Sequence, residues 1–265
     1  MVRARPGGDR EVSAAARSFR YPARVIAHRG GGTLAPENTL AGLREARVRG
    51  FAAVEFDVML ARGDAPILMH DDTLERTTSG AGAVPEHAVA DLARLDAGSW
   101  RDARFAGEPV PTLAAAARVC RDLGLFANVE LKPYAPGGER VARRTGSVVA
   151  TQCGQLWSDA TDAVLLSSFS EAALDAARAA APQLARARLF DAVPADWQAR
   201  LRASACLALH CNGARLDAAT ARAIKAAGYG LMCWTVNDPG DAHRLFDWGV
   251  DAVCTDRLDL FAALG

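Results

Sequence analysis

The sequence predicts an α/β fold of the (β/α)8 (TIM) barrel type, and three observations support this. Short apolar runs alternate with helical stretches along most of the chain, as in parallel sheets joined by crossover helices. Four segments repeat one order: a helix-period stretch, a glycine, a short apolar run, then polar residues. The length of 265 residues, 50% of them apolar, fits one barrel or two smaller domains, and no linker divides the chain.

The four repeats predict where helices begin and end. Each glycine suits the left-handed position that follows a helix C-terminus. Start signals agree, because Thr112 precedes apolar residues at helical spacing and Asp238 with Pro239 reads as an N-cap followed by proline. Ser170 opens another helix, which Pro182 ends. The repeats cover 40–50 then 51–57, 113–124 then 125–132, 217–228 then 229–237, and 239–249 then 250–256.

The candidate strands number nine, one too many for an eight-stranded barrel. About seven residues separate Val58 from Pro66, whereas a parallel crossover needs roughly a dozen. We therefore expect 66–70 to return as an antiparallel hairpin that turns near Gly63 and Asp64 and brings His70 beside Glu55. Eight parallel strands remain. The candidates are 25–28, 53–58, 66–70, 126–131, 163–167, 185–190, 206–211, 229–235 and 251–254.

The other segments are assigned by composition. Residues 71–111 are rich in Gly, Ala, Asp and Pro without a sustained period, so they predict a small insertion over the barrel mouth. Residues 1–22 are expected to be a flexible tail and 23–265 a single domain. The first residues are polar and arginine-rich, with no signal peptide or membrane span. The six cysteines form no C-x-x-C pair and suit a reduced core. A cytoplasmic location is expected.

The charge balance narrows the possible partners. The formal net charge is zero, and no basic cluster is interleaved with aromatic residues, so nucleic acid is not an expected partner. The oligomeric state is not indicated. A small-molecule ligand fits best.

Ionisable residues end four of the apolar runs. His28 and Arg29 follow the first, Glu55 and Asp57 end the second, His70 the third, and Glu130 and Lys132 the fourth. The carboxyl ends of barrel strands meet at one face, where barrel enzymes build their sites. We expect these side chains to form one site.

The acidic residues of this set predict a bound cation. Side chains alternate along a strand, so Glu55 and Asp57 share the inward face. Two carboxylates about 4 Å apart repel by about 4 kcal/mol at an effective dielectric near 20. With Glu130, they favour one hard divalent cation, Mg²⁺ or Ca²⁺, over zinc. The alternative is a structural ion network with Arg29 and Lys132.

The histidines supply proton transfer, because imidazole titrates near neutrality. His28 and His70 form a candidate acid–base pair, and Arg29 and Lys132 match a phosphate. His210 ends a strand in the same way, and we leave open whether it lines the site or lies in the core. Gly30 to Gly32 form no nucleotide P-loop, since no Gly-Lys-Ser/Thr follows. A flexible loop with room for substrate is expected there.

Several motifs together resemble the glycerophosphodiester phosphodiesterase family, in particular its bacterial cytoplasmic type. The resemblance runs from about residue 24 to the C-terminus, in the family's order and approximate spacing. The motifs are His28-Arg29-Gly30-Gly31-Gly32, Ala35-Pro36-Glu37-Asn38-Thr39, Glu55-Phe56-Asp57-Val58, His70-Asp71, Asp96-Ala97-Gly98-Ser99-Trp100, Glu130-Leu131-Lys132, Ser168-Phe169, Trp234-Thr235-Val236-Asn237 and Thr255-Asp256.

The resemblance implies metal-dependent hydrolysis of glycerophosphodiesters, such as glycerophosphocholine or glycerophosphoethanolamine, to sn-glycerol 3-phosphate and an alcohol. The nucleophile would be water or the neighbouring glycerol hydroxyl. Alternatives are a lysophospholipase D-like lipid phosphodiesterase or a catalytically silent binding barrel. The implied roles are acid and base for His28 and His70, cation binding for Glu55, Asp57 and Glu130, phosphate binding for Arg29 and Lys132, and glycerol packing for Phe169 and Trp234.

Overall fold

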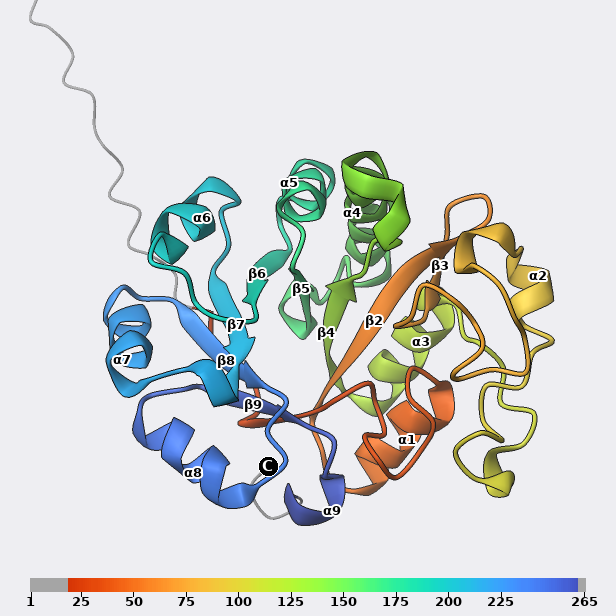
Figure 1. Cartoon of the computed structure of the whole chain (residues 1–265), viewed down its shortest axis with the longest axis horizontal. Coiled ribbons are helices and arrows are strands. Elements are labelled where there is room, and N and C mark those ends of the chain that lie inside the picture. The colour runs from red at the N-terminus through yellow and green to blue at the C-terminus, as the bar shows by residue number, and fades with distance from the viewer. Residues whose placement is uncertain (1–18, 262–265) are drawn as a thin grey trace, which may run out of the picture.

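A computed structural model describes residues 19–261, and its eight parallel strands close into a barrel (Figure 1). The strand order is β1-β9-β8-β7-β6-β5-β4-β2, and pairing of β1 with β2 closes the ring. This confirms the predicted (β/α)8 barrel. The parallel strands are β1 (Val25–Ala27), β2 (Ala53–Ala61), β4 (Phe126–Leu131), β5 (Val164–Ser168), β6 (Ala185–Phe190), β7 (Ala208–Asn212), β8 (Gly230–Trp234) and β9 (Ala252–Thr255).

The ninth strand forms the predicted hairpin. Strand β3 (Ala65–Leu68) pairs antiparallel with β2, with Leu68 opposite Val58 and Ala65 opposite Ala61. The turn uses Gly63 and Asp64, both in the left-handed region with φ of 79° and 63°. Glycine and aspartate tolerate that region better than most residues. The connection is thus too short for a crossover and has the right residues for a turn.

Helices surround the barrel, and the predicted caps hold. Thr112 accepts a hydrogen bond from the Ala115 amide and Asp238 from the Asp241 amide. The helices are α1 (Leu40–Val48), α3 (Leu113–Leu123), α4 (Gly138–Leu156), α5 (Glu171–Ala180), α6 (Trp197–Ala203), α7 (Ala218–Ala226), α8 (Pro239–Asp247) and α9 (Leu258–Phe261), with 3-10 turns at Ala135–Gly137, Thr161–Ala163 and Gly213–Arg215.

The end of the barrel opposite the carboxyl ends of the strands is filled by inward side chains. The segment that precedes β1, which includes Phe19 and Tyr21, closes it. Phe19 and Tyr21 pack against an apolar cluster that includes Ile26, Phe126 and Met232. The expected boundary of the tail at residue 22 therefore falls inside a packed segment. Residues 1–18 of that tail lie outside the described part of the chain.

The insertion at 71–111 is ordered and has a small core of its own. Leu74, Val84 and Leu92 pack with Met59 and Ile67 of the hairpin. In Figure 1 the insertion lies beside β3, at the flank of the barrel. It contains α2 (Val89–Leu92) and two 3-10 turns, Val84–Glu86 and Ala103–Phe105.

Two further findings concern the chain as a whole. All six cysteines are free and buried, as the prediction of a reduced core requires. Among residues 19–261, no helix combines the length and the apolar character that a membrane crossing needs.

Candidate active site

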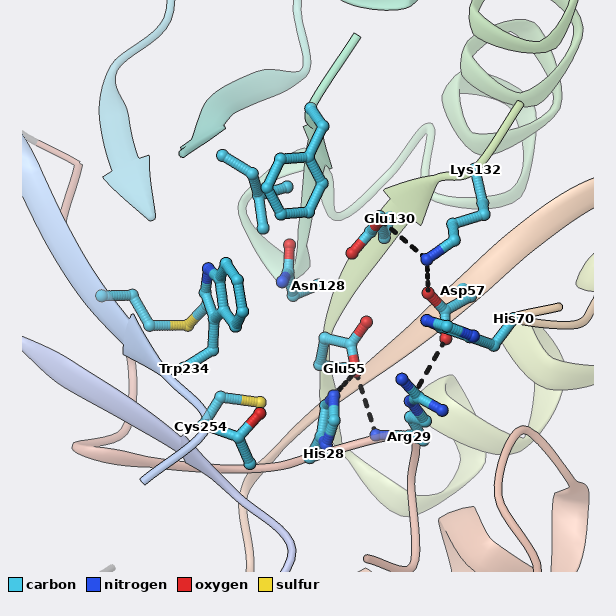
Figure 2. Close-up of a pocket in the computed structure, with 14 residues that line it drawn as sticks. His28, Arg29, Glu55, Asp57, His70, Asn128, Glu130, Lys132, Trp234 and Cys254 are labelled. Carbon is cyan, nitrogen blue, oxygen red and sulfur yellow. Dashed lines mark hydrogen bonds and ion pairs between the residues drawn. The ribbon is translucent and has the colours of Figure 1, made fainter. Parts of the chain in front are cut away.

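A cavity of about 120 Å³ opens at the carboxyl ends of the strands, and all nine predicted site residues line it (Figure 2). Strand periodicity and the hairpin therefore brought the right side chains together. The lining residues are His28, Arg29, Glu55, Asp57, His70, Asn128, Glu130, Lys132, Phe169, Leu189, Met232, Trp234, Thr235 and Cys254.

The three acidic residues form one buried cluster. Neighbouring strands β2 and β4 place Asp57 opposite Glu130. Each of Glu55, Asp57 and Glu130 offers a carboxylate oxygen, and these oxygens all lie within 4.8 Å of one another. Burial and the negative charge of Asp57 raise the pKa of Glu55 to about 7 and that of Glu130 to about 8. The cluster thus carries negative charge that the protein compensates incompletely.

The nearby cations act mainly on Asp57. Lys132 Nζ lies 3.6 Å from Asp57 and 3.7 Å from Glu130, and Arg29 Nε lies 3.7 Å from Asp57. Burial raises the pKa of Asp57, but Lys132 and Arg29 outweigh this effect and lower it. Asn38 also donates to Asp57 at 3.0 Å. An ion network with Arg29 and Lys132 exists, yet it leaves Glu55 and Glu130 with raised pKa values.

Asn128 adds a polar oxygen to the cluster. It faces Glu55 across the β2–β4 pairing and is 1% exposed. Its Oδ1 has no hydrogen-bond partner among the described residues. Because buried polar atoms are nearly always paired, this oxygen is available to a group bound in the cavity. The sequence places Asn128 on the face of Glu130 but does not predict it as a site residue.

His28 is oriented by Asp256, which follows β9, and by Asn237, which follows β8. Its Nδ1 lies 2.6 Å from the Asp256 carboxylate, which in turn accepts from Asn237 at 3.1 Å. A carboxylate accepts only, so Nδ1 carries a proton and Nε2 faces the cavity, 3.9 Å from Glu55. Burial lowers the pKa of His28, but the Asp256 hydrogen bond and the Glu55 charge exceed this and raise it.

His70 has the same arrangement on the other side of the cluster (Figure 2). Its Nδ1 lies 2.6 Å from Asp71, which leaves Nε2 for the cavity. Burial lowers the pKa of His70 more than the charge of Asp57 raises it, and Arg29 lowers it further. Within the carboxylate cluster, the residue that acts on the pKa of His70 is thus Asp57, two residues beyond the Glu55 expected beside it.

Arg76 of the insertion connects both halves of the site. It donates two hydrogen bonds of 2.7 Å to Glu37 and also hydrogen bonds to Asp71. Glu37 accepts from Arg29 at 2.8 Å. Arg76 therefore supports His70 through Asp71 and Arg29 through Glu37. Nothing in the sequence distinguishes Arg76 from the many surface arginines.

The glycine loop after His28 is tightly packed and provides no open space for substrate. A Cβ on Gly32 would lie 2.3 Å from the Asp256 carbonyl oxygen, and one on Gly31 would lie 2.5 Å from Ala35 Cβ. The expected flexible loop is thus wrong: the glycines let the loop pack against its neighbours. Arg29 itself adopts φ of 50°, and its amide donates to Glu55 at 2.9 Å.

Phe169 and Trp234 form an aromatic corner of the cavity. Their ring centroids are 5.6 Å apart at 80°, an edge-to-face contact that aromatic rings favour. Phe169 remains 45% exposed, and Leu189 and Met232 line the same cavity. The cavity thus has an ionic side and an apolar side.

His210 lies in the core. It is fully buried, its Nε2 lies 2.8 Å from the Tyr21 hydroxyl, and burial lowers its pKa to about 3. It is absent from the lining of the site cavity, which includes Met232 of the neighbouring strand. This settles the alternative left open by the sequence.

Comparison with known proteins agrees with the fold and assigns the chain to a family. The sequence profile of the glycerophosphoryl diester phosphodiesterase family matches residues 28–260. A glycerophosphodiester phosphodiesterase of Caldanaerobacter subterraneus is 30% identical, covering 88% of this chain and 93% of its own length. One from Bacillus subtilis is also 30% identical, with 94% and 90% covered.

A solved structure is also similar. An Oleispira antarctica phosphodiesterase, in complex with the product sn-glycerol-3-phosphate, superimposes with a TM-score of 0.83 at 37% identity, covering 91% of this chain and 96% of that chain. The barrel is consistent with these matches. The chain therefore belongs to the glycerophosphoryl diester phosphodiesterase family and is an enzyme of that class.

Proposed function

We propose that the enzyme hydrolyses glycerophosphodiesters, including glycerophosphocholine and glycerophosphoethanolamine, to sn-glycerol 3-phosphate and an alcohol. The observation that carries the proposal is the position of His28 and His70. Both line a cavity that holds three buried carboxylates, and each has Nδ1 bound to its own aspartate. The similar Oleispira enzyme, solved with sn-glycerol-3-phosphate, supports the product.

The carboxylate cluster fits one divalent cation. Glu55, Asp57 and Glu130 supply only oxygen, the donor type that Mg²⁺ and Ca²⁺ prefer. The raised pKa values of Glu55 and Glu130 and the unpartnered Asn128 Oδ1 are the features expected of such a site without its ion. When bound, the cation would polarise the phosphoryl oxygens and offset their charge.

Arg29 and Lys132 are the proposed phosphate ligands. Both line the cavity, and both lie beside Asp57 at distances longer than a direct hydrogen bond. They therefore keep donor capacity for an anion. Fixed positive groups placed before the reaction stabilise the charge that builds on the phosphoryl oxygens.

The two histidines are the proposed acid and base. One accepts the proton of the attacking hydroxyl as the new P–O bond forms. The other donates its Nε2 proton to the departing alcohol oxygen, which takes the electron pair of the broken P–O bond. Asp256 and Asp71 hold His28 and His70 in the required tautomer. Groups of this kind contribute about 10² to 10⁴ in rate each.

Phe169 and Trp234 are the proposed contacts of the glycerol carbons. Their edge-to-face pair gives the cavity an apolar surface. Figure 2 shows Trp234 on the opposite side from Asp57, His70 and Lys132. A substrate with a short carbon chain and a phosphate has the matching polarity. Loss of either ring should raise KM more than it lowers kcat.

The decisive assay measures release of sn-glycerol 3-phosphate from glycerophosphocholine after chelation, and again after Mg²⁺ or Ca²⁺ is restored. We expect activity to disappear with chelator and to return with one of the two ions. His243→Ala serves as the control, because His243 lies on α8, away from the cavity lining. No release under either ion would contradict the proposal.

Two further substrates test the finer points. An ester of 1,3-propanediol phosphate lacks the neighbouring hydroxyl, so it reacts only if water is the nucleophile. Lysophosphatidylcholine tests the lysophospholipase D-like alternative, since turnover of the lysolipid above that of glycerophosphocholine would favour it. We propose the cytoplasm as the location, because all six cysteines are free and buried, as expected in a reducing compartment.

A further inference from the structure

A second cavity of about 280 Å³ adjoins the first. It shares His28 and Arg29 with the first cavity, and its other walls come from the 32–37 loop, the insertion and Asp256. A phosphodiester has two ester arms, so a phosphate held at Arg29 would have one cavity available for each arm. The lining residues are His28, Arg29, Gly32, Thr33, Glu37, Trp100, Arg101 and Asp256.

The polar side chains of the second cavity are already paired with one another. Glu37 accepts from Arg29 and from Arg76, and Asp256 binds His28. The side chain of Arg101 donates to the Thr33 carbonyl oxygen. The prominent surface left for a ligand is therefore the indole ring of Trp100, which is 41% exposed.

A rigid turn holds Trp100 in this exposed position. The carboxylate of Asp96 accepts from the amides of Gly98, Ser99 and Gly107 at 2.8, 2.9 and 3.0 Å. The indole N–H of Trp100 donates to the Ala97 carbonyl at 2.9 Å. The hydrogen bonds of the turn therefore fix the position of the ring, and the indole N–H already has a hydrogen-bond partner.

The turn leaves no room for a side chain at Gly98. A Cβ there would lie 1.9 Å from the Phe105 carbonyl oxygen. Arg104 then anchors the insertion to the loop after His28, since its Nη2 donates to the Leu34 carbonyl at 2.8 Å. The position of Trp100 relative to His28 and Arg29 is thus set by several independent contacts.

We propose that Trp100 forms a subsite for the leaving alcohol of the phosphodiester, and that a cationic amino alcohol such as choline fits it best. The inference rests on the proposed function. The face of an indole attracts an ammonium group. The carboxylates of Glu37 and Asp256 offset the charges of Arg29 and Arg101 in the same cavity, so the ring itself supplies the preference for a cation. Because the polar side chains of the second cavity are already paired, the alcohol would bind mainly by contact with the Trp100 ring and by the attraction between that ring and a positive charge.

The test compares two esters that differ only in the leaving alcohol. Glycerophosphocholine reaches the second cavity, whereas the methyl ester of glycerol 3-phosphate is too short. Trp100→Ala should lower kcat/KM for glycerophosphocholine about tenfold, between the values for an exposed and a desolvated cation–ring contact, and change the methyl ester less than about twofold. Trp100→Phe should retain most of the preference, and Arg94→Ala, an exposed change in the same insertion, should change neither.

Three readouts separate the possible outcomes. Inhibition by sn-glycerol 3-phosphate should be unchanged in Trp100→Ala, because the product occupies the first cavity. An uncharged 3,3-dimethylbutyl ester should lose less than the choline ester does. Calorimetric titration of His70→Ala with glycerophosphocholine, with and without Trp100→Ala, should show about tenfold weaker binding in the double variant.

Equal losses on both esters, or no loss on glycerophosphocholine in a variant with an unchanged unfolding midpoint, would overturn the subsite. The failure of the proposed function has another signature. In that case the unaltered enzyme releases no glycerol 3-phosphate from either ester, whatever residue stands at position 100. Binding that does not depend on Trp100 would overturn the subsite even then.

Discussion

Replacing Glu130 by glutamine tests the charge balance of the carboxylate cluster. The change keeps the shape of the side chain and removes its ionisation. Glu130 is buried beside Asp57, and burial followed by the charge of Asp57 raises its pKa from 4.5 to about 8. Lys132 lies 3.6 Å from Asp57, and the substitution changes neither residue of this pair. The variant therefore isolates the free energy of ionising one buried carboxyl group.

The magnitude follows from the pKa values of the folded and unfolded states. A carboxyl group with a raised folded-state pKa contributes stability that is complete below pH 4.5 and is lost as the pH rises to about 8. At about 1.4 kcal/mol per tenfold change in proton activity, Glu130 costs the metal-free protein about 3 kcal/mol between pH 5.5 and pH 8. In a chain of this size, that is a fall of about 6–12 °C in the unfolding midpoint.

The assay is thermal unfolding in chelator at pH 5.5 and pH 8. The unaltered protein should lose about 3 kcal/mol more between the two pH values than Glu130→Gln does. Glu139→Gln is the control, since Glu139 lies exposed on α4, where it pairs with Arg143. Adding Mg²⁺ or Ca²⁺ at pH 8 should raise the free energy of unfolding of the unaltered protein by about 2.7 kcal/mol at one hundred times Kd. The unfolding midpoint should rise accordingly, and that of Glu130→Gln much less.

Parallel stability curves for the unaltered protein and Glu130→Gln would refute this reasoning. They would mean that Lys132 and Arg29 neutralise the cluster fully, as a structural ion network does. Equal stabilisation of both proteins by the cation would refute the part of the argument that concerns Glu130 as a ligand. The unfolding experiment measures the charge balance of the carboxylate cluster without measuring enzyme activity.

Three other predictions follow from the contacts. His28→Ala and His70→Ala should each lower turnover at least 10²-fold, and losses within tenfold would exclude the acid–base roles. Arg76→Gln releases the two carboxylates that hold His70 and Arg29, so kcat should fall about tenfold, with partial recovery in Arg76→Lys, while the unfolding midpoint changes little. Tyr21→Phe leaves His210 buried without its partner; unfolding should require about 1–3 kcal/mol less and kcat should stay unchanged.

Much of the fold and site was predictable because their signals are local. Helix caps, glycines after helices and a connection too short for a crossover are read over a few residues. Side-chain alternation places Glu55 and Asp57 on one face, and parallel strands bring their ends to one edge. The seven ionisable residues predicted in this way line one cavity, and so do Phe169 and Trp234, which the family resemblance implied.

The groups that orient the catalytic candidates were not assigned these roles from the residues alone. The partner of His28 is Asp256, 228 residues away, and Arg76 reaches Glu37 across 39 residues. Each pair depends on where separate loops meet above the barrel. A side chain in a loop carries no periodicity, and in an arginine-rich chain its type indicates little.

His210 shows the same limit within a strand. Alternation indicates that its side chain points inward, but the depth along the barrel axis depends on the tilt and stagger of all eight strands. The tertiary structure places it beside Tyr21, at the closed end of the barrel. The sequence by itself thus determined the barrel, the hairpin and the residue types at the strand ends, since these follow from short-range periodicity. The partners of the histidines, the depth of His210 and the position of Trp100 were decided only by the tertiary structure, because loops distant in sequence converge there.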